Sequence, residues 1–596
     1  MKRLLGFLKP HWPLVAWLAV LNLALAGLMT VGPIVIKAIV DNVITAKELS
    51  VLPGYLALLV GVSLIRATAQ YFYGRDRERL GQVVITDIRT ALYRKLLALS
   101  YSFYDNEQTG RIMSRITSDV ESTRIFLAFI LIDSALQVTV IAVMLISLIR
   151  LDTTMALIAI VPTVISGITL YVFYQRWRSI NRQIQEQNAV ASGVLQDSLS
   201  GIKVVKSFAQ EPQEQEKYEK AALEQRRLNI LANRRWYMRY PFIAAVPRLM
   251  QLTLIVVGGY QIMNGAITLG TLVASISFTG LMLGAANALG TQLTALGQTS
   301  TAAVRIFEML DEPVRIKSPE RPVKPGEIGG DLRFDKVTFK YATAKASALK
   351  NVNLHVPAGT SLALVGATGS GKTTLVQMIG RFYDPTTGSV LIDNRDVRTL
   401  DLRELRQQIG IVAQDGLLFS ATIGENIALG RPDASQEEIE RAARMAQAHE
   451  FITQMPDGYN TLIGERGTGL SGGQRQRVAI ARAILLNPRI LILDDSMSAV
   501  DAETERLLQD AIASVMRGRT TILIAHRMST VQKADNIIVL RDGEIVEQGT
   551  HEALMRSGGY YQTVLELQRM TAAESMDEVL NRAPDPIPAI DSFSQS

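Results

Sequence analysis

Long apolar stretches without any charge dominate the first half of the sequence. No Asp, Glu, Lys or Arg occurs at positions 13–36 or at positions 249–304. Because a helix needs about 20 apolar residues to cross a bilayer, the second stretch is long enough for two crossings, joined by a turn at Asn264-Gly265. With three further apolar runs, the pattern predicts six membrane-spanning helices, at residues 14–40, 53–73, 126–149, 153–174, 243–263 and 268–298.

Lys and Arg are concentrated in two long segments between the predicted spans, at residues 74–125 and 175–240. The connections on the other side, 41–52, 150–152 and 264–267, are short, and Lys47 and Arg150 are their only basic residues. Since basic loops remain in the cytoplasm, we expect both termini and both long segments to be cytoplasmic. The long segments also have helical periodicity, so we expect the spans to continue as helices into the cytosol, with tips at residues 105–110 and 198–201.

The N-terminal segment 1–12, MKRLLGFLKPHW, combines basic and apolar side chains. It predicts a short amphipathic helix that lies on the inner face of the membrane. The alternative interpretation is a secretory signal peptide, but no small-residue cleavage site follows a short apolar region. The sequence therefore favours a first span that is retained.

The composition excludes several classes of protein. The chain has 596 residues, and 62 Lys and Arg against 56 Asp and Glu give a net charge of only +6, which argues against a protein that coats nucleic acid. Hydrophobic residues make up 48% of the chain, which excludes disorder over most of its length. There is no cysteine, so disulfides, thiolate zinc sites and a cysteine nucleophile are all excluded.

The composition changes after residue 309. Prolines mark a polar linker, and from Gly330 onward short β-branched strands alternate with helical stretches, as expected of an α/β domain. The last residues are acidic and contain several prolines, and they predict a disordered tail. We therefore divide the chain into an interfacial helix (1–12), a membrane domain (13–310), a linker (311–330), an α/β domain (331–571) and a tail (572–596).

A phosphate-binding loop follows a buried strand of the predicted α/β domain. The strand 362–365 runs into a sequence of the form G-x-x-x-x-G-K-[ST], after which a helix is expected. Glycines let backbone N–H groups curl around phosphate, and the helix N-terminus adds its dipole. We expect Lys372 to reach the β- and γ-phosphates and Thr373 to ligate Mg²⁺. The predicted ATP-binding loop comprises Gly366, Ala367, Thr368, Gly369, Ser370, Gly371, Lys372, Thr373 and Thr374.

A second apolar strand, 490–493, ends in Asp494-Asp495. A carboxylate at the end of a strand beside a phosphate loop is placed to hold Mg²⁺, and we assign that role to Asp494. Asp495 is the next acid, and we expect it to orient or deprotonate the attacking water. A strand that ends in solvent can give the same pattern. The two aspartates indicate an Mg²⁺ site only because the sequence also contains the phosphate loop.

The sequence Leu470-Ser471-Gly472-Gly473-Gln474 precedes a predicted helix, where a hydroxyl and glycine N–H groups can bind phosphate. Together with the two motifs above, this LSGGQ sequence resembles the signature of the ATP-binding cassette family. The resemblance implies that Asp495, Gln414 and His526 are catalytic. It further implies Tyr341 as the residue that stacks on adenine, Gln414 as the Q-loop glutamine and an Mg²⁺ ligand, Ser498 and Asp501 in the D-loop, and His526 as the switch histidine.

The first half also resembles family members that have membrane and nucleotide domains fused in one chain. Residues 103–115 and 201–208 are similar to the two segments that couple these domains in exporters. The resemblance covers about residues 1–570, and six spans with one cassette indicate a half-transporter. It implies a dimer with two ATP molecules between the cassettes, each held by the phosphate loop of one subunit and the signature of the other.

The implied function is ATP-driven export of a lipophilic or amphipathic substrate (a drug, a lipid or a peptide) by alternating access. An importer and an ATP-gated regulator on the same scaffold are the alternatives. A soluble ATPase of the DNA-repair kind does not fit, because it lacks spans and carries a coiled coil between its ATP motifs. The resemblance implies ATP and Mg²⁺ as cofactors and no nucleic-acid partner. We expect the chain to lie in the inner (cytoplasmic) membrane of a bacterium.

One residue departs from the family pattern. Active sites of this family usually have Glu after the Asp that holds Mg²⁺, whereas this chain has Asp495. Its carboxylate is one methylene shorter, and a misplacement of about 1 Å can cost roughly 100-fold in rate. Asp at this position resembles the degenerate site of heterodimeric exporters, so the pattern favours a heterodimer over a homodimer that uses Asp495 as a poorer base.

Two charges lie within predicted spans, Arg66 in the second and Asp133 in the third, at similar depth. Charges inside a membrane are costly and usually face each other or a cavity. We therefore expect Arg66 and Asp133 either to form a pair or to line a polar cavity. The alternative is that they snorkel toward the inner headgroups.

Overall fold

The computed structural model describes residues 2–413, 416–464, 467, 469–494, 502–524, 531–563 and 565. The chain divides into two compact units, of which the first comprises residues 1–97 and 109–312. The second comprises residues 98–108 and 313–596, so a short segment between two membrane helices belongs to the unit of the α/β domain.

The first unit is helical throughout its regular structure. Its N-terminus forms a turn of α-helix and a 3₁₀ segment before the first long helix, and short turns join the long helices at one end. The elements are α1 (Lys2–Leu5), a 3₁₀ helix (Gly6–His11), α2 (Trp12–Ala38), α3 (Leu52–Ala98), α5 (Thr109–Ser114), α6 (Val120–Arg124), α7 (Ile132–Leu151), α8 (Thr153–Ser200), α9 (Ile202–Ser207), α10 (Glu211–Met263) and α11 (Leu269–Asp311).

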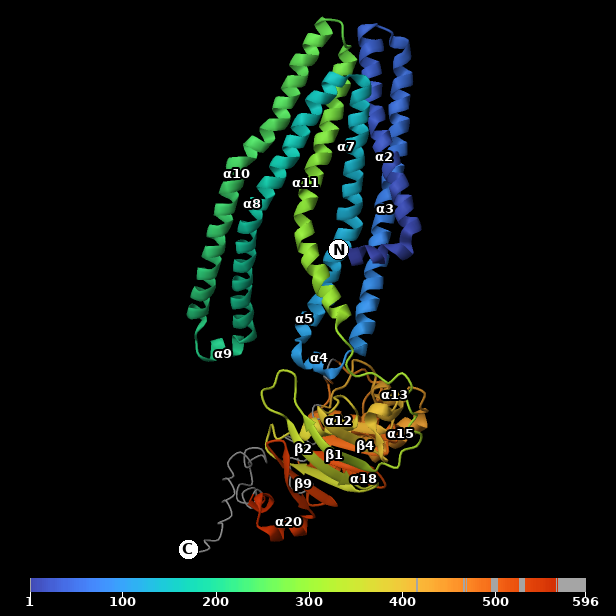
Figure 1. The fold of residues 1–596 in the computed structure, drawn as a ribbon, viewed down its shortest axis with the longest axis vertical. Coiled ribbons are helices and arrows are strands. Elements are labelled where there is room, and N and C mark those ends of the chain that lie inside the picture. Colours follow the sequence, from blue (N-terminus) through green and yellow to red (C-terminus); the bar gives the residue numbers. More distant parts are fainter. Residues whose placement is uncertain are drawn as a thin grey trace. The chain divides into compact units, whose positions relative to one another are not determined.

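Four helices are much longer than a membrane crossing requires. Helices α3, α8, α10 and α11 contain 47, 48, 53 and 43 residues, against the roughly 20 that span a bilayer. Helices α8 and α10 lie side by side and are joined by α9 at their far end (Figure 1). The predicted continuation of the spans as long helices is therefore confirmed.

Four helical stretches among the described residues are long and apolar enough to cross a membrane: Arg3–Thr45, Leu49–Ala98, Thr109–Leu151 and Leu269–Gln292. A shorter apolar stretch, Thr153–Thr169, lies in α8. The predicted spans at 153–174 and 243–263 lie on α8 and α10, where several side chains fall outside the described part of the structure. None of the apolar window of α3 is buried within the chain, as expected of a helix that faces lipid or another subunit.

The core of the first unit forms around α11. Phe278 and Met282 of this helix are buried against Met144 and Leu148 of α7, together with Ala26 of α2. Helix α8 begins with a side-chain cap, because the Asp152 carboxylate accepts a hydrogen bond from the backbone N–H of Met155 (2.8 Å).

The second unit contains two sheets. The strands are β1 (Leu332–Phe339), β2 (Leu349–Val356), β3 (Ser361–Val365), β4 (Thr387–Ile392), β5 (Arg395–Asp396), β6 (Ile409–Val412), β7 (Ile490–Asp494), β8 (Thr520–Ile524), β9 (Asn536–Arg541) and β10 (Glu544–Gly549). One sheet has the order β2-β1-β4-β5 and is antiparallel. The other has the order β10-β9-β3-β8-β7-β6, in which only β10 is antiparallel to its neighbour.

Helices α12 and α17 pack on the two faces of the six-stranded sheet. The helices of the second unit are α12 (Lys372–Ile379), α13 (Leu402–Gln407), α14 (Ile423–Ile427), α15 (Gln436–Met445), α16 (His449–Thr453), α17 (Gly472–Leu485), α18 (Ala502–Met516) and α20 (His551–Ser557), with α4 (Tyr101–Asn106) from the segment 98–108. Successive side chains of a strand point to opposite faces. Leu362 and Leu364 of β3 therefore join the core that contains α12 and the antiparallel sheet, whereas Ala363 and Val365 join the core that contains α17.

Candidate nucleotide-binding site

The predicted phosphate loop lies between β3 and α12, at the end of a fully buried strand. Gly369 and Gly371 have φ of 83° and 104°, which non-glycine residues rarely adopt. A Cβ on Gly371 would lie 2.5 Å from the carbonyl oxygen of Ala348, and one on Gly366 would collide with the carbonyl oxygen of Leu540. The loop is therefore wound closely against its neighbours, and only glycine fits at these positions.

Lys372 begins α12 and turns back over the loop. Its Nζ donates hydrogen bonds to the carbonyl oxygens of Gly366 (2.6 Å) and Ala367 (3.0 Å), and the side chain is buried. The Ser370 hydroxyl is buried and has no hydrogen-bond partner among the described residues. A buried ammonium, an unsatisfied hydroxyl and a glycine cradle at a helix N-terminus together fit a bound triphosphate.

Tyr341 lies beside this loop. Its hydroxyl is hydrogen-bonded to the Thr374 hydroxyl (2.9 Å), and its ring packs edge-on against Phe339. A cavity of about 540 Å³ opens next to it, with Thr373 also in its wall. The residue predicted to stack on adenine therefore lies next to the phosphate loop, beside a space that a base could enter.

Asp494 ends β7 at the same edge of the sheet as the phosphate loop. The strand register pairs Asp494 with Ile524 of β8, and Ile524 is in turn paired with Leu364 of β3. The ends of β3 and β7 are thus level, one strand apart. Thr373 is exposed on the first turn of α12, which follows β3. The Thr373 hydroxyl and the Asp494 carboxylate, both oxygen ligands of the kind that Mg²⁺ prefers, therefore come from the ends of β3 and β7.

Five predicted site residues lie outside the described residues: Gln414, Asp495, Ser498, Asp501 and His526. Their roles stay predictions. Strands β6 and β8 end shortly before Gln414 and His526, at Val412 and Ile524.

The signature segment begins α17. Ser471 is the N-cap: its hydroxyl accepts from the Gln474 N–H (3.3 Å), and its own N–H donates to the Gln474 side chain (2.9 Å). Ser471 and Gly472 are exposed, whereas Leu470 and Gly473 are buried. The apolar residues of α17 lie in the core on the face of the six-stranded sheet opposite to α12. Helix α17, which the signature begins, and helix α12, which follows the phosphate loop, therefore pack on opposite faces of the sheet.

Comparison with known proteins identifies the family. Two family profiles match the chain, the ABC transporter transmembrane region at residues 15–286 and the ABC transporter profile at residues 349–498. The chain is 35% identical to YknU of Bacillus subtilis, named as an uncharacterized ABC transporter ATP-binding protein, over 95% of this chain and 97% of that protein. The chain belongs to the ABC transporter family. Its ATPase domain therefore hydrolyses ATP to drive transport, and the fused membrane and nucleotide domains confirm the predicted fold class.

Other ABC transporters are similar over their whole length. YgaD of Bacillus subtilis, named as a putative multidrug export ATP-binding/permease protein, is 36% identical over 96% of this chain and 99% of that protein. A similarly named protein of Staphylococcus aureus is 37% identical over 96% of this chain and 100% of its own length. Among solved structures, a bacterial Atm1-family ABC exporter with ATP bound has a TM-score of 0.78 and 29% identity, covering 94% of this chain and 98% of that one.

One of the expectations for Arg66 and Asp133, an ion pair between them, is wrong. Asp133 forms an ion pair with Arg77 (2.6 Å) and accepts a hydrogen bond from the Tyr73 hydroxyl (3.1 Å). Arg66 is exposed and forms no ion pair with any described residue. Arg77 lies three helical turns further along α3, about 16 Å from Arg66 at 1.5 Å per residue, so the register between α3 and α7 selects Arg77. The Arg77 guanidinium also lies 4.4 Å from the Phe129 ring centre.

Proposed function

We propose that the chain is one subunit of a two-chain exporter in which each ATP is closed between the phosphate loop of one chain and the signature of the other. The opposite placement of α12 and α17 on the six-stranded sheet carries this proposal. Because the sheet lies between α12 and α17, we infer that one nucleotide does not contact both Lys372 and Ser471 of the same subunit. ATP is thus the bond between the two cassettes, and its hydrolysis releases them.

Magnesium fits the residues at the edge of this sheet. We propose that the Thr373 hydroxyl and the Asp494 carboxylate hold it, with Gln414 as a further ligand. When bound, Mg²⁺ neutralises charge on the β- and γ-phosphates. The buried Lys372 ammonium supplies the second positive charge, and the wound glycine loop orients the phosphates.

The proposed partner is a second, different half-transporter. Asp495 in place of the usual Glu supports a weak hydrolytic site in this chain, while its intact Ser471–Gln474 segment can complete the active site of the partner. A homodimer is the competing arrangement. The proposed location is the inner membrane, with both termini and the ATPase domain in the cytoplasm. The segments 74–125 and 175–240 are rich in Lys and Arg, and basic loops remain on the cytoplasmic side, which supports this orientation.

The proposed cargo is a lipophilic or amphipathic molecule. The names of two relatives describe multidrug export, and the solved relative is described as an exporter. We therefore favour export over import and over gating.

Transport into inside-out membrane vesicles tests the proposed function. Vesicles from the native host that carry the chain and any partner should accumulate a fluorescent lipophilic dye against its gradient when ATP is added outside. Vesicles with the Lys372→Ala variant should show only passive uptake. ATP-driven movement in the opposite direction would establish an importer, and ATP-dependent but strictly downhill flow would establish a channel.

A further inference from the structure

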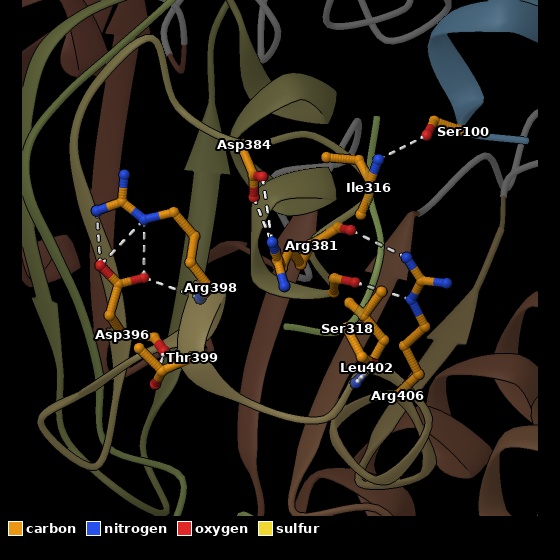
Figure 2. Close-up of polar contacts among 11 residues, drawn as sticks. Ser100, Ile316, Ser318, Arg381, Asp384, Asp396, Arg398, Thr399, Leu402 and Arg406 are labelled. Carbon is orange, nitrogen blue, oxygen red and sulfur yellow. Dashed lines mark hydrogen bonds and ion pairs between the residues drawn. The ribbon is translucent and has the colours of Figure 1, made fainter. Parts of the chain in front are cut away.

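The loop that follows the phosphate-loop helix is held in a fixed shape. Arg406 of α13 donates hydrogen bonds to the carbonyl oxygens of Gly380 (3.1 Å) and Arg381 (2.9 Å) (Figure 2). Arg381 in turn forms an ion pair with Asp384 (2.9 Å). We call residues 380–384 the docking loop. These contacts hold the docking loop at its start, through Arg406, and across its length, through the ion pair between Arg381 and Asp384.

Helix α4 rests on this docking loop. The Phe382 ring lies between the Arg406 guanidinium, 4.7 Å from the ring centre, and the Tyr101 ring, stacked at 4.4 Å. The Tyr383 hydroxyl donates a hydrogen bond to the Asp105 carboxylate. Ser100, just before α4, accepts from the backbone N–H of Ile316 (2.9 Å) (Figure 2). Helix α4 is therefore held within the second unit at both ends, by the linker residue Ile316 at its start and by the docking loop along its length.

Tyr383 also contacts the nucleotide side of the same domain. Its ring packs edge-on against Tyr341, with centres 5.4 Å apart. The Tyr341 hydroxyl is bonded to Thr374, at the end of the phosphate loop. A continuous series of contacts thus runs from Thr374 through Tyr341 and Tyr383 to Asp105.

The cavity beside Tyr341 has α4 as one of its walls. Tyr341, Thr373 and Gln377 line it from the nucleotide side, while Ser102, Asp105 and Asn106 line it from α4. Its volume of about 540 Å³ lies in the ordinary range of small-molecule sites. A base stacked on Tyr341 would occupy the space between that ring and α4.

The Tyr383 hydroxyl keeps its proton, and with it its hydrogen bond to Asp105, over a wide range of pH. The side chain is only 6% exposed. Burial, and then the Asp105 carboxylate, raise the pKa of the Tyr383 hydroxyl well above its usual value. The hydroxyl therefore stays protonated and remains a donor at every physiological pH.

We propose that Tyr383 is a positioning residue through which the nucleotide base holds α4 in place. A base stacked on Tyr341 limits the movement of the Tyr341 and Tyr383 rings. Because the Tyr383 hydroxyl is bonded to Asp105, α4 is then also less free to move. This inference rests on the proposed role of Tyr341 in base stacking. It predicts that α4 responds to the base of the nucleotide and not to its phosphates alone.

Hydrogen exchange of the full chain in lipid nanodiscs, with any co-purifying partner, tests this inference. ATP and inorganic triphosphate are compared with magnesium withheld to prevent hydrolysis. Both should slow exchange of α12, but only ATP should slow exchange of Tyr101–Asn106, by about tenfold, the effect of one hydrogen bond to a charged group. In Tyr383→Phe, ATP should still protect α12 but no longer α4, and KM for ATP should stay within about twofold.

Matched variants separate this role from general stability. Tyr561→Phe removes another buried hydroxyl, bonded to His551 at 2.8 Å in the same unit, and should leave the α4 response intact. Asp105→Asn keeps a carbonyl acceptor and should retain the response, whereas Asp105→Ala should lose it. Adding Tyr383→Phe to Asp105→Ala should cause no further loss, because both variants break the same contact.

Several results would overturn the inference. Equal protection of α4 by triphosphate and ATP would show that the base plays no part. A normal α4 response in Tyr383→Phe would show that the hydroxyl plays none. If ATP protected neither α12 nor α4 in the unchanged chain, the assignment of the nucleotide site would fall, and this inference with it. Protection of α12 without α4 would contradict the inference alone.

Discussion

Replacing Lys372 by alanine is expected to lower ATP hydrolysis by at least about 100-fold, the usual cost of losing one charged group that stabilises the transition state. The Lys372 ammonium is buried and bonded to the carbonyl oxygens of Gly366 and Ala367. A neutral methyl group leaves the developing charge on the phosphates without its nearest fixed cation. Phosphate release by the purified transporter in nanodiscs measures the effect.

Lys350→Ala is the matched control for this prediction. Lys350 lies exposed on β2 of the same domain, and its Nζ is 4.0 Å from a Glu544 carboxylate oxygen. An ion pair this exposed contributes little, so the control should keep its activity. Loss of activity in both variants, or in neither, would contradict the role given to Lys372.

Replacing Asp495 by glutamate is expected to raise hydrolysis by roughly 10- to 100-fold. The added methylene gives the side chain the length of the usual glutamate, and a misplacement of about 1 Å in a reacting group carries a cost of that size. The measurement is the ATPase rate of the assembled transporter and of the isolated chain, each with and without the Asp495→Glu change, with the affinity for ATP determined in parallel.

The exposed Asp433 provides the control for this change. Asp433→Glu makes the same chemical alteration on the surface and should leave the rate unchanged. Equal rates for the unchanged chain and the Asp495→Glu variant would show that carboxylate reach does not limit hydrolysis. Robust turnover by the unchanged chain alone would remove the argument for a partner with a different sequence.

The local parts of the site could be predicted from the sequence. The phosphate loop depends on glycines at fixed spacing between a strand and a helix, and the helix begins at Lys372 as the motif requires. The Asp494 position follows from the end of an apolar strand. Membrane spans are also local, because hydropathy over some 20 residues decides them.

The contacts between distant segments could not be predicted in this way. Tyr383 and Asp105 are 278 positions apart, and only the packing of α4 on the docking loop brings them together. The partner of Asp133 depends on the register between two helices, which hydropathy does not contain. Two π-helical segments, Arg115–Asp119 and Ile125–Leu131, precede α7 and change the number of residues per turn there. The apolar pattern of the sequence does not predict them.

Cross-linking from the signature tests the central claim most directly. The chain has no natural cysteine, so Ser471→Cys offers a single thiol for a short photoreactive reagent. In the assembled transporter with ATP, the reagent should join two chains, and peptide mapping should place its other end in the phosphate loop of the second chain. That second chain will be a copy of this one or a different protein, which also decides between a homodimer and a heterodimer. Insertion into residues 366–374 of the same chain, or no two-chain product with ATP, would contradict the account.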